Sequence, residues 1–293
     1  MTRKIQLLFI WLFMLMLLCL NGFATAEANN PGYEFYFQQL DANQQAIYRT
    51  ILSAPAKSAT YTIVLPERET SEATLAQKVY TVASVMGMDH PESMAWFFWT
   101  GDISYNAATN TATIELISAE HYDPKDQALS EKLLDTIVAS ANPDWDLYTK
   151  ALFTSNVVVD ALDYDWKYVF YPENGKADYY NSNIFCVNNG YAICGGFSKL
   201  YKAIADRIGL PCVEVGSVGH AWVHVQMEDG NWYGVEPQNP LRLQGTSTML
   251  NVEFFSDGSD MYTLYDGFFG EGEFNKIRQP ERTTYDYIYM PAK

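Results

Sequence analysis

The sequence predicts an α+β fold, and three observations carry this prediction. Up to residue 209 the strongest patterns place apolar residues three or four positions apart, which is the helix period. After Pro211 apolar and polar residues alternate over short runs, as in β-strands. Asp229-Gly230 then marks a turn between two such runs, so we expect an antiparallel sheet with a helix packed against it.

The first 26 residues are typical of an export signal. Arg3 and Lys4 precede an apolar run over 5–20, and Ala24-Thr25-Ala26 is a small-residue cleavage site. The run is short for a membrane span, although an uncleaved anchor is an alternative. We expect a secreted or cell-surface protein, which contacts a membrane only through this segment if it is uncleaved.

Residues 27–125 are predicted to form an N-terminal α+β extension. Its expected helices lie within 34–53 and 72–86, its first strand at 61–65 and its hairpin strands at 103–105 and 111–117. His90 to Ser93 is expected to open a loop or short helix that carries the aromatic residues 96–99. Buried core is the preferred interpretation of these aromatics, and a binding patch is the alternative.

A boundary at Pro124-Lys125-Asp126 is predicted to separate this extension from a second domain, residues 126–293. Two helices are expected at 129–140 and 147–162, followed by a polar loop at 174–183. Beyond a further helix that starts near Cys194, strands are expected at 212–215, 219–227 and 231–236.

The formal net charge of −16 restricts the partners of the chain. An acidic surface keeps an exported protein soluble and repels polyanions. We therefore expect no nucleic-acid partner and no binding to anionic lipid.

Cys194 stands between a small-residue loop and a helical pattern over 197–208 that Gly209 ends. The thiol therefore lies at a helix N-terminus, where free N–H groups and the helix dipole lower its pKa. Gly195 and Gly196 are expected to let a substrate backbone approach the sulfur. The pattern indicates a nucleophile.

A thiolate that attacks an acyl group needs a base, and the base needs an orienting acceptor. Of the four histidines, His220 and His224 lie on the strand that follows the Cys194 helix. His220 is preferred because it stands at the end of the strand, where a helix N-terminus can meet it. His224 lies roughly 13 Å further along.

Glu236, on the next strand, is the candidate acceptor. A two-residue turn at Asp229-Gly230 would place Val223 opposite Glu236 and turn the carboxylate to the wrong face. A three-residue loop with Gly230 left-handed places Trp222 opposite Glu236 and makes His220 a diagonal neighbour. We therefore predict the three-residue loop.

Other kinds of site are disfavoured. The cysteines and histidines lack the paired spacing of a zinc site, and Gly196 stands where a phosphate-binding loop has Lys. The aspartates near residue 164 fit a solvated helix end better than a cation site. Cys186 and Cys212 either form a disulfide or are two buried thiols.

Four ordered motifs resemble the transglutaminase-like superfamily. They are Cys194-Gly195-Gly196-Phe197-Ser198, Ile208-Gly209-Leu210-Pro211-Cys212, His220-Ala221-Trp222-Val223 and Trp232-Tyr233-Gly234-Val235-Glu236-Pro237. The match covers 127–240, about 40% of the chain, and the front half is similar to extensions of exported bacterial members.

The resemblance implies a papain-like core, in which the nucleophile helix packs on an antiparallel sheet. It implies Cys194 as nucleophile, His220 as base and Glu236 as orienting acid. Separately, we expect no cofactor and no metal. The family usually has Asp at the position of Glu236; the extra methylene still allows contact with an imidazole.

Two hypotheses about function follow. The first is an exported thiol-dependent enzyme that transfers the acyl group of a Gln side chain or peptide bond through a Cys194 thioester to water or a Lys amine. Its partner would be a protein or peptide substrate, with cell-wall association as one option, and Trp222 either lines the acyl site or packs in the core. The second is a non-catalytic module that binds a cell-wall polymer or surface protein.

Overall fold

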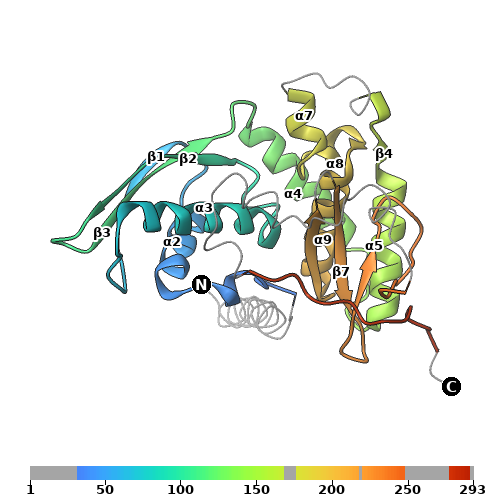
Figure 1. The fold of residues 1–293 in the computed structure, drawn as a ribbon. Helices are drawn as coiled ribbons and strands as arrows, with labels where there is room; N and C mark the ends of the chain where they lie inside the picture. Colours follow the sequence, from blue (N-terminus) through green and yellow to red (C-terminus); the bar gives the residue numbers. More distant parts are fainter. Residues whose placement is uncertain (1–31, 168–175, 218–219, 248–276, 291–293) are drawn as a thin grey trace, which may run out of the picture.

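The structure, a computed structural model, describes residues 32–167, 176–217, 220–247 and 277–290. The predicted export signal therefore lies outside the described residues. Two α+β units lie side by side, the first drawn in blue to green and the second in green to orange (Figure 1). Among the described residues, no helix has the length and apolar character needed to cross a membrane.

The first unit is a three-stranded antiparallel sheet with helices against one face (Figure 1). The strand order is β1-β3-β2, and alternation along β3 buries Ala112, Ile114 and Leu116 beneath α3 and α2. Its elements are η1 (Phe37–Gln39), α2 (Ala42–Leu52), β1 (Ala59–Val64), α3 (Glu72–Asp89), β2 (Phe97–Asn106) and β3 (Thr111–Ser118).

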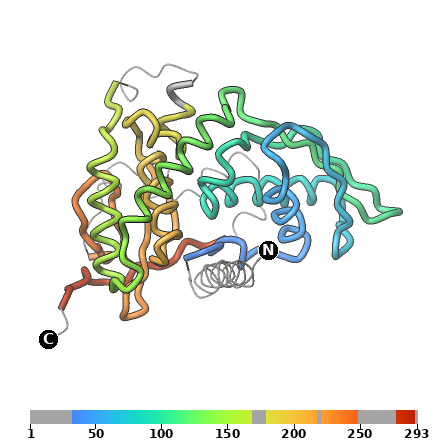
Figure 2. Tube along the Cα trace, turned by 180° about the vertical axis from the view of Figure 1, so that it is seen from behind, coloured from blue at the N-terminus to red at the C-terminus, as the bar shows by residue number. Residues whose placement is uncertain are grey.

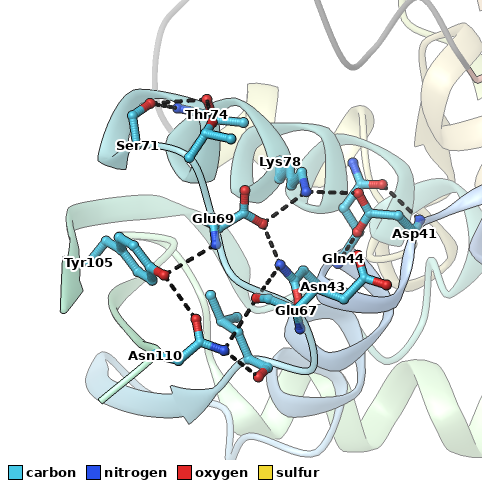
Figure 3. A network of polar contacts seen from close by, with 12 residues as sticks. Asp41, Asn43, Gln44, Glu67, Glu69, Ser71, Thr74, Lys78, Tyr105 and Asn110 are labelled. Atoms are coloured by element: carbon cyan, nitrogen blue, oxygen red, sulfur yellow. Dashed lines mark hydrogen bonds and ion pairs between the residues drawn. The ribbon is translucent and has the colours of Figure 1, made fainter. Parts of the chain in front are cut away.

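A polar network fastens the loop between β1 and α3 to the rest of this unit (Figure 3). Lys78 of α3 lies 2.9 Å from Asp41, the N-cap of α2, and 2.8 Å from Glu69 of the loop. The Tyr105 hydroxyl accepts from the Glu69 N–H and donates to Asn110 at the hairpin turn. The loop is therefore held from both sides by side chains that the sheet and the helices supply.

The second unit has three layers. A sheet of order β6-β7-β8 packs on α9, and the long helices α4 and α5 lie behind α9, as the view from behind shows (Figure 2). Its elements are α4 (Pro124–Val138), α5 (Leu147–Ala161), β4 (Asp163–Tyr164), α7 (Lys176–Asn181), α8 (Cys186–Asn189), β5 (Tyr191–Ala192), α9 (Cys194–Ile208), β6 (Cys212–Ser217), β7 (His220–Gln226) and β8 (Trp232–Val235).

The central helix α9 forms as the sequence predicts. Phe197, Leu200, Tyr201 and Ile204 are buried between the sheet and the outer helices. Gly209 ends the helix in the left-handed conformation at φ 71°, which glycine adopts without strain. The helix is thus fixed along its length, and its first residue is Cys194.

The two units share a hydrophobic core. Val213, Val215 and Trp222, on the sheet face away from α9, pack into the core of the first unit. The Tyr36 hydroxyl donates to the Glu214 carbonyl at 2.7 Å. Because both faces of this sheet are covered, the first unit supports the strand that carries His220.

Two local predictions for the first unit are wrong. Residues 97–99 belong to β2 rather than to a loop or short helix, and α3 continues through Gly87 to Asp89. Within β2 the side chains alternate, so Phe98 is 68% exposed between the half-buried Phe97 and Trp99, whereas Trp96, before the strand, is buried. The aromatic run is therefore only partly core.

Candidate active site

Cys194 lies at the first position of α9, as predicted. Ile193 is the N-cap, and its N–H donates to the Asn181 carbonyl at 2.9 Å, which fixes the entry into the helix. The thiol is half-buried and free. It therefore meets the unpaired N–H groups at the start of a 15-residue helix.

Gly196 has a different role from the one the sequence suggested. A Cβ at this position would lie 2.4 Å from the Asn181 carbonyl oxygen and 3.0 Å from the Ala192 Cβ. The glycine therefore allows α9 to pack against its own preceding chain, whereas the prediction was that it opens the sulfur to substrate. At Gly195 the nearest atom to a Cβ would be the Ser182 carbonyl oxygen, at 3.3 Å.

The β7–β8 hairpin has the predicted register. Val223 pairs with Val235, so Trp222 is opposite Glu236. The loop is Glu228-Asp229-Gly230, with Gly230 at φ 79°. His220 is consequently the diagonal neighbour of Glu236, and its Nε2 donates to Glu236 Oε2 at 3.1 Å.

The thiol and the imidazole form an electrostatically coupled pair. Burial alone would raise the Cys194 pKa, but a hydrogen bond and the charge of His220, with the N–H groups of Ala221 and Gly195, lower it below the usual value. Burial alone would lower the His220 pKa, yet Cys194 and Glu236 raise it to about 9. A thiolate beside an imidazolium is the state that these shifts favour.

Glu236 is buried at the end of β8 and accepts a second hydrogen bond from Gln238 Nε2 at 3.0 Å, on the same oxygen Oε2. Its other oxygen, Oε1, has no hydrogen-bond partner among the described residues. His220 and Gln238 thus bind the same carboxylate oxygen, Oε2, from two directions.

Tyr164 is a site residue that the sequence analysis missed. Strand β4 pairs in parallel with β5, which places Tyr164 beside Ala192, two residues before Cys194. The hydroxyl accepts a hydrogen bond from the Cys194 N–H, while burial and the nearby thiol charge raise its pKa. A neutral O–H donor therefore lies at the amide where an oxyanion would bind.

Trp222 is 9% exposed and belongs to the core shared by the two units. Its ring is nearly parallel to that of His220, with centroids 6.0 Å apart and an interplanar angle of 18°. Trp222 thus packs in the core and lies against His220, and its role in lining an acyl site stays a prediction.

The other candidate ligands and thiols have other partners or environments. Cys186 and Cys212 are free and buried, so they form no disulfide, and burial raises the pKa of Cys186 to about 12. His90 contacts Glu34 at 3.0 Å in the first unit. Asp165 accepts a hydrogen bond from Asn181, and no metal-type cluster of His, Cys, Asp or Glu occurs in the described ranges.

Comparisons with known proteins gave weak structural similarities. No family model and no curated protein matches the chain. Among solved structures, a transglutaminase is 12% identical with a TM-score of 0.36, over 69% of this chain and 56% of that one. A protein from Cytophaga hutchinsonii, provisionally described as a cysteine protease, is 15% identical with a TM-score of 0.29, over 45% and 52%.

The periplasmic domain of TgpA from Pseudomonas aeruginosa is 13% identical with a TM-score of 0.27, over 43% of this chain and 55% of that one. The chain thus spans about half the length of each of these structures. At these identities and TM-scores, evidence for a function comes from the geometry of the site itself.

Proposed function

We propose that the chain is an exported thiol-dependent acyl-transfer enzyme. One observation carries the proposal: the His220 imidazole interacts with the Cys194 thiol and, through Nε2, with the Glu236 carboxylate. A nucleophile, a base and an orienting acceptor in this order are what thioester chemistry needs. Cys194 is the proposed nucleophile, His220 the proposed acid and base, and Glu236 the proposed orienting group.

In the proposed reaction, the Cys194 thiolate attacks the carbonyl carbon of an amide. The new C–S bond forms as the carbonyl π electrons move to oxygen, which becomes an oxyanion. When the oxyanion collapses, the C–N bond breaks and the leaving amine takes the proton from His220. Water or a second amine then attacks the thioester while His220 removes its proton, and the thiolate is regenerated as the acyl product leaves.

The oxyanion needs donors, and we assign two. The first is the Cys194 N–H at the start of α9. The second is the Tyr164 hydroxyl, which is hydrogen-bonded to that N–H and which its raised pKa keeps protonated. A carbonyl oxygen that enters here would displace this contact and accept from both groups.

The contact between Glu236 and His220 favours the enzyme over a non-catalytic module. The module hypothesis rests on Glu236, which stands where the family usually has Asp, and on the aromatic-rich front half. The longer side chain reaches the imidazole at 3.1 Å, and Gln238 holds it there. Binding alone does not require a Cys194 thiol of lowered pKa beside a His220 imidazole of raised pKa, whereas catalysis by a thiolate does.

The proposed location and substrate rest on the sequence. An export signal over 1–26 and a net charge of −16 fit a secreted or cell-surface protein. The proposed substrate is a protein or peptide, with cell-wall association as one option, and the proposed chemistry is hydrolysis or Gln–Lys crosslinking. We propose no role for nucleic acid.

An activated ester tests the proposal without knowledge of the natural substrate. With p-nitrophenyl acetate we expect a burst of nitrophenolate and an acetyl group on Cys194, located by peptide mass spectrometry. Cys194→Ser should abolish both signals, while Cys212→Ser, a change at a buried thiol, should keep them. Equal acetylation of the folded wild type and Cys194→Ser, with no burst from either, would overturn the proposal.

A further inference from the structure

His224 is a buried histidine that the proposed chemistry does not use. It lies on β7, on the same face as Trp222 and His220, and is 5% exposed. Both ring nitrogens have partners: Nδ1 lies 2.8 Å from the Pro280 carbonyl oxygen and Nε2 lies 3.0 Å from Trp222 Nε1.

These partners determine the state of the ring. A carbonyl oxygen only accepts and an indole N–H only donates, so Nδ1 carries the proton and Nε2 carries the lone pair. Burial, and to a smaller extent the charge of Arg282, lowers the His224 pKa to about 3, although the Pro280 carbonyl raises it. His224 is therefore a neutral ring in a single tautomer.

The indole of Trp222 connects this ring to the site. Its N–H points to His224, and its face lies against His220 with centroids 6.0 Å apart. A buried indole N–H requires an acceptor, and among the described residues Nε2 of His224 is the acceptor that it has. The hydrogen bond to His224 thus fixes the orientation of the Trp222 indole ring, which lies against His220.

The carbonyl that sets the tautomer comes from the C-terminal segment, residues 277–290. This segment, in dark red, runs from the side of the first unit across the sheet (Figure 1). The Arg278 N–H donates to Gln39 Oε1 at 2.8 Å, and Gln279 Nε2 donates to the Gly216 carbonyl of β6 at 2.8 Å. The Thr283 N–H donates to the Trp232 carbonyl of β8 at 3.0 Å, so Pro280 is held over β7 from both sides.

We propose that His224 is a positioning residue: held by the Pro280 carbonyl as the Nδ1–H tautomer, it orients Trp222, which holds the His220 ring between Cys194 and Glu236. The C-terminal segment then contributes to the active site through the Pro280 carbonyl. This inference rests on the proposed role of His220.

Three variants test it in the full chain. His224→Phe keeps a ring but removes both hydrogen bonds, whereas His224→Gln keeps an amide that can accept from Trp222 and donate elsewhere. His121→Gln, at a half-buried histidine after β3, is the matched control. The readouts are the acetylation rate of Cys194 by p-nitrophenyl acetate and the pH profile of Cys194 alkylation by iodoacetamide.

We expect His224→Phe to lower the acetylation rate about tenfold, because a small misplacement of a catalytic group is costly. Weaker contact of His220 with Cys194 should also raise the thiol pKa and so move the acid limb of the alkylation profile to higher pH. His224→Gln should recover most of the rate, and His121→Gln should match the wild type. A folded His224→Phe with wild-type rate and profile would overturn the inference.

A measurement on the wild type keeps the inference testable if the variants fail to fold. Nitrogen-15 NMR of histidine-labelled protein should show His224 neutral and protonated at Nδ1 at pH 6, and an Nε2–H tautomer or a charged ring would overturn the inference. If wild-type Cys194 forms no acetyl-enzyme, the proposed function fails. If it forms one and the His224 variants behave as wild type, only the positioning role fails.

Discussion

Glu236 Oε2 accepts a hydrogen bond from His220 Nε2 at 3.1 Å, although the two residues stand diagonally on adjacent antiparallel strands. The contact depends on a hairpin loop of three residues, because a two-residue turn would send the Glu236 side chain to the other face. The register of the hairpin thus aligns the carboxylate with the imidazole.

Substitution of the carboxylate tests its part in this alignment. Glu236→Gln should lower the rate of Cys194 acetylation by about 10²-fold, since an amide stabilises the imidazolium less well than a carboxylate. The acetylation rate of Glu236→Asp, whose side chain is one methylene shorter, should lie between the rates of the wild type and Glu236→Gln. Burst kinetics measure the rates, and Glu120→Gln, at an exposed position, is the control. A wild-type rate in Glu236→Gln would remove Glu236 from the mechanism.

The coupled pKa values predict the pH dependence of the thiol. The pKa of Cys194 is lowered and that of His220 is about 9. The thiolate–imidazolium pair therefore exists at pH values between these two pKa values. Alkylation of Cys194 by iodoacetamide should therefore be fast at pH 7 and fall as acid protonates the thiolate. Amide cleavage should also fall above about pH 9, because His220 then has no proton for the leaving amine.

Cys186 supplies the internal reference for that experiment, since it is buried and its pKa is raised to about 12. In the folded protein it should react far more slowly than Cys194, and peptide mass spectrometry resolves the two. Equal labelling of both thiols at pH 7 would contradict the predicted difference.

Tyr164→Phe tests the second oxyanion donor. Removal of one such donor typically costs about 10²–10³-fold in kcat, so we expect a loss of this order with KM little changed. The ring stack of Tyr164 on Phe197, with centroids 5.9 Å apart, should survive the substitution. Thermal unfolding therefore serves as the control, and an unchanged kcat would assign the donor elsewhere.

Two glycine-to-alanine substitutions separate close packing from helix propensity. Gly196→Ala should destabilise the protein by about 1–3 kcal/mol, because the Cβ would overlap the Asn181 carbonyl. Gly87→Ala, inside α3 with no atom within 4 Å of the new Cβ, should stabilise it by about 0.5–1 kcal/mol. Denaturant unfolding measures both, and shifts of the same sign would contradict this assignment.

The sequence predicted the parts of the site that local rules determine. The helix period after Cys194 and the glycine at position 230 fix the place of Cys194 at the helix start and the hairpin register. Tyr164 was missed because its contact with Cys194 arises from a two-residue parallel pair, β4 with β5, which has no periodic signal. A strand of two residues shows too little alternation of apolar and polar residues to be predicted from the sequence.

The relation between the two units was also beyond local rules. Val213 and Val215 alternate with residues that face α9, yet both faces of β6 are covered, so the alternation does not reveal a solvent side. The sequence predicted a soft boundary at 124–126, and its local patterns did not indicate that residues on both sides of it share a hydrophobic core. The same is true of Pro280, whose contact with His224 joins residues 56 positions apart.

The ultraviolet absorbance of the thiolate tests the central claim most directly, because it needs no substrate. At pH 7 the difference spectrum of wild type minus Cys194→Ser should contain the absorbance of one thiolate, and His220→Ala should lose it. A wild-type protein that gains this absorbance only near the pKa of an ordinary cysteine would contradict the coupled pair of Cys194 and His220.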